Sequence, residues 1–292
     1  MSKFLYKNGL PFNGRLPETL DKIMLRIQNN KAAMIVIDGA SGEGKTTLGV
    51  EIVNYIHGYY FGRGVWIDYK AQYAMGGKDF HIKLRISKDQ KKIVVIYDEA
   101  GDFSNRNFAS NFNRMLQRVF EAYRTFKILV ICILPVVGDL DNGVFKLGVV
   151  RLLINCHSRK KNYGCIRAYS LYRTFYLKDK MKKLTVPRMA YRFVRPNFKC
   201  YFKNLPPGRE KELDLISTKG KDKTILKNEI AQKGLITFEQ MEDKLHKGKN
   251  WVREKVKKLN IKPTLRIGQR KFFNKSALFK LENLIYENQS NI

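Results

Sequence analysis

Apolar and polar positions follow two patterns along the first half of the chain. Short apolar runs predict strands near residues 32–37, 64–68, 93–97, 128–134 and 149–155. Continuous runs of this kind are typical of buried parallel strands, which are covered on both faces. A helix-compatible segment follows the first run directly. This order of elements predicts an α/β domain with a mainly parallel sheet.

Residues 165–203 follow a different pattern, in which aromatic side chains are interleaved with Arg and Lys. The near-alternating runs Ala168–Leu177 and Met189–Val194 predict strands, because alternation is typical of a half-buried strand. We therefore expect a basic, aromatic β extension at about 165–203. It would close a first domain that spans residues 1–204.

A break follows at Leu205-Pro206-Pro207-Gly208, where two prolines and a glycine cannot continue a helix or a central strand. We expect a linker over 205–222 and a second domain over 223–292. The elements expected there are a helix over 223–233, a helix capped by Thr237 and Gln240 that ends near Leu245, a helix over 251–259 capped by Asn250, two strands around Gly268, and a last helix from Asn274. Two short helices joined by a glycine turn and followed by a hairpin predict a winged helix-turn-helix domain.

The helix over 251–259 separates apolar from basic positions. We expect Val252, Val256 and Leu259 to pack inward. The side chains expected to face DNA are Lys249, Asn250, Arg253, Lys257, Lys258, Arg266, Arg270 and Lys271. The pattern resembles winged helices of the MerR or excisionase kind. A helical assembly domain with a basic exterior is the alternative.

Charge sets the middle of the chain apart. The 292 residues include 56 Lys or Arg and 26 Asp or Glu, which gives a net charge of +30. Residues 151–204 hold 15 basic and one acidic side chain, a net charge of +14. Such an excess repels itself unless an anion is bound, and nucleic acid is the anion that it favours.

Composition also excludes two classes of protein. A hydrophobic content of 44% excludes wholesale disorder. The longest apolar run, Ile128–Val137, is ten residues long and too short to cross a bilayer, so we expect no integral membrane segment. The four cysteines lack paired spacing, which predicts a reducing compartment and a cytoplasmic location.

Candidate chemistry begins directly after the first predicted strand. Gly39, Gly44, Lys45 and Thr46 fit the spacing G-x-x-x-x-G-K-[ST], between a strand and a helix as that motif requires. Backbone N–H groups of such a loop surround phosphates, the lysine reaches the β- and γ-phosphates, and the hydroxyl ligates Mg²⁺. The expected nucleotide-binding residues are Gly39, Ala40, Ser41, Gly42, Glu43, Gly44, Lys45, Thr46 and Thr47.

The second half of such a site is a strand that ends in an acid. The run 93–97 leads into Asp98 and Glu99. We expect Asp98 to hold the Mg²⁺ through water. Thr46 and Asp98 are then the two residues expected to bind the metal. Glu99 is expected to polarise a water for attack on the γ-phosphate, which predicts an NTP hydrolase rather than a small-molecule kinase.

Together these motifs resemble the HerA/FtsK-type branch of P-loop ATPases, which includes virus packaging ATPases and the zonular-occludens-toxin-like proteins of filamentous phages. The chain is particularly similar to ATPases of archaeal mobile elements. The resemblance covers roughly residues 25–160 and includes, after the Asp-Glu-Ala-Gly segment, Phe103-Ser104-Asn105-Arg106-Asn107-Phe108, a helix with Asn113, Leu116, Phe120 and Arg124, and a strand that ends in Pro135. It implies a RecA-like P-loop NTPase fold with ATP and Mg²⁺ as cofactors.

The resemblance also implies an arginine that acts on the nucleotide of a neighbouring subunit. The catalytic candidates are Arg114, Arg118 and Arg124, with Arg106 as a further one. At Pro135 these motors usually carry a glutamine or another polar sensor residue, and Asn155 is the substitute that we expect.

The resulting expectation is an ATP-hydrolysing motor that translocates, packages or transfers double-stranded DNA for a virus or mobile element. The resemblance implies a homo-oligomer such as a hexameric ring. Two alternatives stay open. One is a non-motor DNA-binding regulator or partition factor switched by ATP. The other is a morphogenesis ATPase with a membrane or virion-assembly partner, in which the basic segment contacts anionic lipid.

Overall fold

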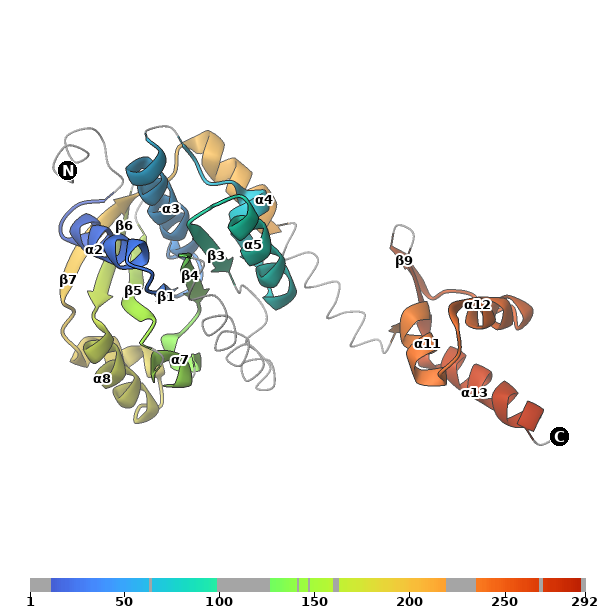
Figure 1. The fold of residues 1–292 in the computed structure, drawn as a ribbon. Helices are drawn as coiled ribbons and strands as arrows, with labels where there is room; N and C mark the ends of the chain where they lie inside the picture. Colours follow the sequence, from blue (N-terminus) through green and yellow to red (C-terminus); the bar gives the residue numbers. More distant parts are fainter. Residues whose placement is uncertain are drawn as a thin grey trace. The chain divides into compact units, whose positions relative to one another are not determined.

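A computed structural model describes residues 12–62, 65–98, 127–140, 142–146, 148–159, 163–218, 235–267 and 270–289. The chain forms two compact units, Met1–Ile216 and Ser217–Ile292 (Figure 1). Among the described residues, no helix combines the length and the apolar character that a membrane-spanning segment requires.

The first unit is built on one sheet. Its described strands lie in the order β2-β3-β4-β1-β5-β6-β7 (Figure 1). They are β1 (Ala33–Gly39), β2 (Tyr73–Met75), β3 (Val94–Asp98), β4 (Leu129–Leu134), β5 (Val150–Arg159), β6 (Tyr163–Tyr169) and β7 (Phe198–Lys203). The pairs from β2 to β5 are parallel, whereas β5-β6 and β6-β7 are antiparallel. The predicted α/β class with a mainly parallel sheet is confirmed.

The central strand β1 is buried on both faces. Ile35 and Ile37 belong to one hydrophobic core, while Met34 and Val36 belong to a second core on the opposite face. Because successive side chains of a strand point to opposite faces, a strand between two cores is a continuous apolar run. This is why the run was recognisable in the sequence.

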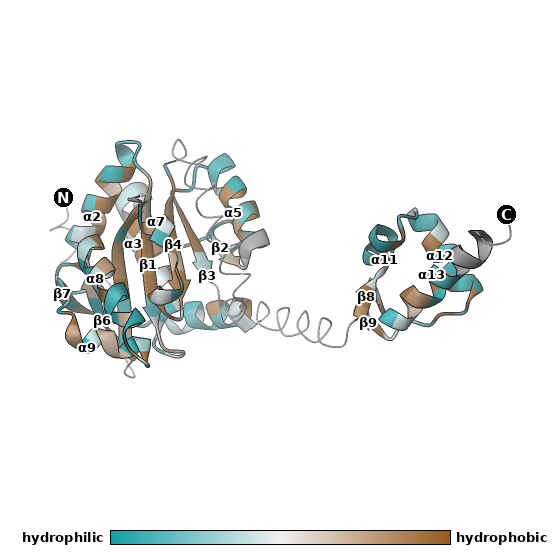
Figure 2. Cartoon of the chain, turned by 90° about the horizontal axis from the view of Figure 1, so that it is seen from below, coloured by the Kyte–Doolittle hydropathy of each residue, from teal (hydrophilic) through white to brown (hydrophobic). Residues whose placement is uncertain are grey.

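Helices cover both faces of the sheet. The core that contains Ile35 also includes residues of α2 (Leu16–Gln28) and α3 (Lys45–Phe61). The core that contains Met34 includes residues of α5 (Gly77–Asp89), α7 (Asn142–Lys146) and α8 (Leu171–Lys182). Figure 2 shows the brown, hydrophobic strands enclosed between helices that carry teal, hydrophilic positions.

The strand predicted at 64–68 is wrong. Its described part, 65–68, is not a strand, and Asp68 instead caps the short helix α4 (Tyr69–Gln72) by accepting hydrogen bonds from two backbone N–H groups. A capping carboxylate of this kind starts a helix. The outermost described strand on this side of the sheet is β2, which pairs with β3.

The strand predicted over Ala168–Leu177 is also wrong beyond Tyr169, where β6 ends. The helix α8 follows, and its buried side chains are Thr174, Leu177, Lys178 and Met181. This spacing of three, four and seven residues follows one helix face, which explains why the segment does not continue as a strand.

The strand predicted over Met189–Val194 is replaced by two short helices, η4 (Pro187–Met189) and α9 (Ala190–Phe193). The expected β extension at 165–203 is therefore only partly made of strands. Its strands are the antiparallel neighbours β6 and β7, and helices connect them.

Residues 207–218, which lie within the predicted linker 205–222, are helical. Pro207 is the first helical residue, a position where proline is well tolerated because its missing N–H would have no intrahelical partner. Leu213 is buried in the core that contains α3, and the guanidinium carbon of Arg209 lies 4.9 Å from the ring centroid of Trp66. This helix therefore packs as part of the first unit.

The second unit combines helices with a small sheet. The described strands β8 (Leu235–Thr237), β10 (Arg270–Asn274) and β9 (Leu265–Ile267) are antiparallel neighbours in that order. The described helices are α11 (Phe238–Leu245), α12 (Lys249–Lys258) and α13 (Lys275–Gln289). The helix predicted over 223–233 lies outside the described residues.

Of the two helix caps predicted in this unit, one is confirmed and one is wrong. The capping box is confirmed, because Thr237 accepts from the backbone N–H of Gln240 and the Gln240 side chain accepts from Thr237 N–H. Asn250, however, is not a cap. The helix α12 is capped by Gly248, whose carbonyl accepts the first intrahelical bond. Leu259, expected to pack inward, is 37% exposed.

Candidate nucleotide-binding site

The candidate site lies where β1 ends. Residues 39–44 connect β1 to α3, and α3 begins at Lys45 with Gly44 as its N-cap. The carboxyl ends of the parallel strands β1, β3, β4 and β5 meet at this edge of the sheet. Ligands of open α/β sheets bind at such an edge, and the N–H groups at a helix N-terminus favour an anion there.

Gly39 allows the loop to leave the sheet. Its φ of +150° is rare for residues with a side chain, and an added Cβ would overlap the carbonyl oxygen of Cys156. Gly42 and Gly44 each have a φ of +81°. The predicted loop glycines therefore adopt the conformations that a tight phosphate loop needs.

The lysine of the motif is folded onto its own loop. Lys45 Nζ donates to the carbonyl oxygens of Gly39 at 2.9 Å and Ala40 at 2.7 Å. Burial lowers the pKa of Lys45 below its ordinary value, and the charges of Asp98 and Glu43 partly oppose this shift. The Glu43 carboxylate accepts a hydrogen bond from Ala40 N–H, which is one of the loop amides expected to contact phosphate.

The two predicted motifs come together at the start of α3. Thr46 Oγ1 donates to Asp98 Oδ2 at 2.8 Å, although the two residues are 52 positions apart. The hydroxyl of Tyr73 donates to the same carboxylate oxygen at 2.6 Å. Burial raises the pKa of Tyr73 well above its ordinary value, and the Asp98 charge adds to this effect, so the phenol remains a donor.

Thr46 and Asp98 fit a magnesium site. Hydroxyl and carboxylate oxygens are ligands of this hard cation, which keeps several waters and is completed by phosphate oxygens of a nucleotide. The other loop residues surround this point. Ser41 and Gly42 are exposed, while Thr47 is buried in the first turn of α3.

A second carboxylate lies beneath the loop. Asp38, 1% exposed, accepts from Asn155 Nδ2 at 3.0 Å through Oδ1. Its Oδ2 accepts from Val137 N at 3.0 Å and from the hydroxyl of Tyr191. Burial raises the pKa of Asp38 to about 6, although these three hydrogen bonds oppose the shift.

Sequence reasoning assigned no role to Asp38 or Tyr191. The available signal was an acid at the end of an apolar strand, which is unusual for a buried position. Asn155, the expected sensor, hydrogen-bonds this buried acid, and its role as a sensor stays a prediction.

Several predicted site residues lie outside the described part of the chain. They are Glu99, Arg106, Arg114, Arg118 and Arg124. Their roles stay predictions.

The second candidate surface is in the second unit. On α12, Val252 and Val256 are buried, as predicted. The predicted DNA-facing residues that are exposed are Lys249, Asn250, Arg253, Lys257, Lys258 and Lys271, whereas the side chains of Arg266 and Arg270 lie outside the described ones.

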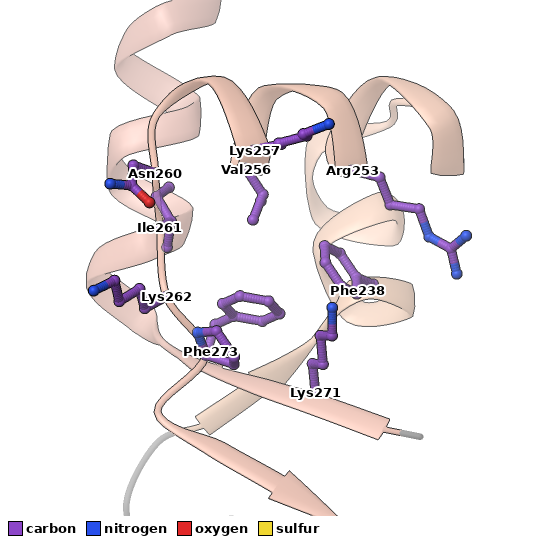
Figure 3. Close-up of a pocket in the computed structure, with 10 residues that line it drawn as sticks. Phe238, Arg253, Val256, Lys257, Asn260, Ile261, Lys262, Lys271 and Phe273 are labelled. Atoms are coloured by element: carbon purple, nitrogen blue, oxygen red, sulfur yellow. The ribbon is translucent and has the colours of Figure 1, made fainter. Parts of the chain in front are cut away.

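A pocket of about 590 Å³ lies within this surface. Figure 3 shows Arg253 and Lys257 on α12 and Lys271 on β10 around the rings of Phe238 and Phe273. The ring centroids of Phe238 and Phe273 are 4.8 Å apart, with the rings edge to face. The guanidinium carbon of Arg253 lies 5.8 Å from the ring centroid of Phe238. The pocket thus combines an aromatic base with a cationic rim.

No protein-family model matches the chain, and no curated protein does so either. A KaiC-like protein from the hyperthermophilic archaeon Pyrococcus horikoshii OT3 is similar in structure, with 10% identity, a TM-score of 0.32 and coverage of 48% of this chain and 80% of that one. The first unit has the RecA-like P-loop NTPase fold. We base this assignment on its strand order, in which β4 lies between the phosphate-loop strand β1 and the acidic strand β3.

Proposed function

We propose that this chain is a Mg²⁺-dependent ATPase of the HerA/FtsK type that binds duplex DNA and moves it, for packaging or transfer in a virus or mobile element. The observation that carries the ATPase part is the 2.8 Å hydrogen bond between Thr46 Oγ1 and Asp98 Oδ2. It brings the hydroxyl of the phosphate loop and the acid of the second motif to one point, as cation-assisted cleavage of a triphosphate requires.

Four residues, Lys45, Thr46, Asp98 and Glu99, have distinct roles in this proposal. Lys45 exchanges its loop carbonyls for the β- and γ-phosphate oxygens. Thr46 ligates the Mg²⁺ directly and Asp98 holds it through water. Glu99, directly after Asp98 in the chain, orients the attacking water. When bound, Mg²⁺ neutralises charge that develops on the phosphate oxygens.

ATP hydrolysis by a Lys45→Ala variant tests the site. We expect loss of turnover, because the lysine is the only proposed side-chain cation on the β- and γ-phosphates within the loop. DNA binding should be retained. Lys22→Ala is the matched control, since Lys22 is exposed on α2. Turnover by Lys45→Ala at the wild-type rate would refute the assignment.

The DNA part of the proposal is supported by the surface of α12. α12 carries exposed cations next to the buried Val252 and Val256, so the helix contributes to its own core and also presents positive charge to phosphates. The first unit adds exposed aromatic residues beside basic ones, such as Tyr172, Tyr176 and Phe193. Basic surfaces with interleaved aromatic rings are typical of nucleic-acid binding.

DNA affinity should therefore fall steeply with salt, as expected when several phosphates are contacted. Lys257→Gln should weaken duplex binding and reduce the slope of log affinity against log salt by about one. Lys244→Gln, the same charge change on α11, should not. Stronger binding to anionic vesicles than to duplex DNA at equal salt would favour the membrane alternative.

Translocation requires that DNA accelerate hydrolysis. We expect duplex DNA to stimulate ATP turnover of the full chain but not of a chain that ends at Thr218, which retains the 207–218 helix packed on the first unit. Slow turnover that DNA does not change would favour the regulator or partition factor. The proposed homo-oligomer, with an arginine from a neighbour, predicts that turnover per chain rises with protein concentration.

A further inference from the structure

Arg188 brings a second cation to the phosphate loop. It lies in η4, 149 residues from Gly39, yet its Nη2 donates to Gly39 O at 3.3 Å and to Pro135 O at 3.2 Å. These carbonyls mark the ends of β1 and β4. The guanidinium therefore crosses the edge of the sheet at which the loop begins.

The carbonyl oxygen of Gly39 is shared with Lys45. Lys45 Nζ lies 2.9 Å from that oxygen and Arg188 Nη2 lies 3.3 Å from it, so the two nitrogens are at most 6.2 Å apart, the sum of these distances. The charge of Arg188 adds to the effect of burial in lowering the pKa of Lys45. Among the described residues, no carboxylate lies within ion-pair distance of Arg188, although the charge of Arg188 acts to lower the pKa of Asp38. Two like charges held this close favour an anion that contacts both.

The segment that carries Arg188 is fixed to the sheet. Three residues further on, the hydroxyl of Tyr191 donates to Asp38 at the end of β1. Tyr191 is buried, and burial raises its pKa well above the ordinary value, so this donor persists at neutral pH. Tyr191 is thus a positioning residue that holds η4 against the loop.

Pro135 occupies the position at which the resemblance implies a polar sensor residue. Pro135 follows the end of β4 and has no polar side-chain atom. Asn155 on β5 is the register partner of Asp38 on β1 and donates its side-chain amide to that residue. Arg188 instead reaches the backbone carbonyls of Gly39 and Pro135 at this edge. A guanidinium has five N–H donors, and the two carbonyls take those of one nitrogen, which leaves donors for a phosphate.

We propose that Arg188 is a ligand of the terminal phosphate of the bound nucleoside triphosphate, supplied by the same chain as the loop. This inference rests on the proposed function of the site. It differs from the arginine expected from a neighbouring subunit, because a ligand from the same chain acts at any protein concentration. It also predicts discrimination between a triphosphate and a diphosphate.

Equilibrium titration with ATPγS and with ADP tests the proposal. Arg188→Gln should weaken ATPγS binding by about tenfold to a hundredfold, the range for one hydrogen bond between charged groups, and ADP binding by less than about twofold. Arg188→Lys should lie between, because lysine keeps the charge but not the fork of donors. Arg192→Gln is the control, since Arg192 is exposed on α9 in the same segment. The effect should be the same at low and high protein concentration.

The outcomes separate this inference from the proposed function. If the wild type binds neither nucleotide, the proposed function and the role of Arg188 are both refuted. If the wild type binds ATPγS, two results refute only the role of Arg188. One is that Arg188→Gln weakens the affinity for ATPγS and for ADP equally, and the other is that it weakens neither affinity. Thermal unfolding of each variant, with Arg188→Lys as the conservative form, shows whether a loss of affinity reflects a folding defect. A variant that unfolds at the wild-type temperature and has a lower affinity for ATPγS alone supports the proposal.

Discussion

Replacing Asp38 by asparagine should change the pH dependence of stability. Asp38 is buried beneath the phosphate loop and accepts hydrogen bonds from Tyr191, Val137 and Asn155. An asparagine keeps the shape and can accept from Tyr191 and Val137 through its oxygen. The Asn155 amide can rotate so that its oxygen faces the new NH₂ group. Asp38→Asn therefore imitates the protonated acid.

The size of the effect follows from the pKa. Burial raises the pKa of Asp38 from 3.8 to about 6. Between these values the native state binds more protons than the unfolded chain, so stability falls as pH rises. The full cost, reached above pH 6, is about 3 kcal/mol, because one pKa unit corresponds to about 1.4 kcal/mol. Asp38→Asn should match the wild type near pH 4 and exceed it by up to about 3 kcal/mol near pH 8.

The assay needs a signal from the first unit alone. The chain has two tryptophans, Trp66 in the first unit and Trp251 in the second. In a Trp251→Phe background, urea unfolding followed by tryptophan fluorescence reports on Trp66. The comparison must be a difference between variant and parent, because burial also raises the pKa of Glu51 to about 7 and adds its own pH dependence. Equal pH dependence of the two proteins from pH 4 to 8 would refute the reasoning.

Three further variants test single contacts. Tyr73→Phe removes a donor to Asp98 and should cost roughly 1.5–3 kcal/mol in stability and raise the Mg²⁺ concentration needed for half-maximal ATP turnover, both measurable by titration. Gly164→Ala places a Cβ against the ring of Phe202 and should lower stability by about 1–3 kcal/mol in urea unfolding; a neutral result would contradict the packing. Thr237→Ala removes the capping box of α11 and should cost about 1 kcal/mol in the second unit alone, seen through Trp251 fluorescence in a Trp66→Phe background.

The parts of the fold that the sequence predicted correctly are those with local causes. The glycine loop between β1 and α3 needs consecutive residues of fixed type, and the capping box needs two residues three positions apart. The buried strand β1 has an apolar side chain at almost every position, so the pattern does not depend on what packs against it. Asp98 follows such a strand, and its contact with Thr46 follows from parallel strand ends meeting at one edge.

The wrong strand prediction for α8 arose because its sequence fits both the two-residue period of a strand and the period of about 3.6 residues of a helix. In α8, apolar, aromatic and basic side chains nearly alternate, but the buried ones recur at helical spacing. Only the packing of that face decides between helix and strand. At 205–208 the prolines correctly marked a boundary between elements, but Pro207 begins a helix instead of a linker. A proline in the interior of a helix breaks it, whereas a proline in the first turn is compatible with the start of a helix.

The basic middle segment shows why net charge overstates a binding surface. Its excess of +14 was assigned as a whole to contact with an anionic partner. Yet Lys178 is buried, donates to Leu140 O and lies 4.4 Å from the ring centroid of Phe145, so its charge contacts the interior of the first unit and not a partner. Arg188 is exposed, but it donates to two backbone carbonyls at the loop after β1. Charge inside the fold contributes to composition as much as charge on its surface, and only the contacts separate the two. The salt dependence of DNA binding should accordingly reflect fewer cations than this segment contains, because a buried cation such as Lys178 releases no counterion from DNA.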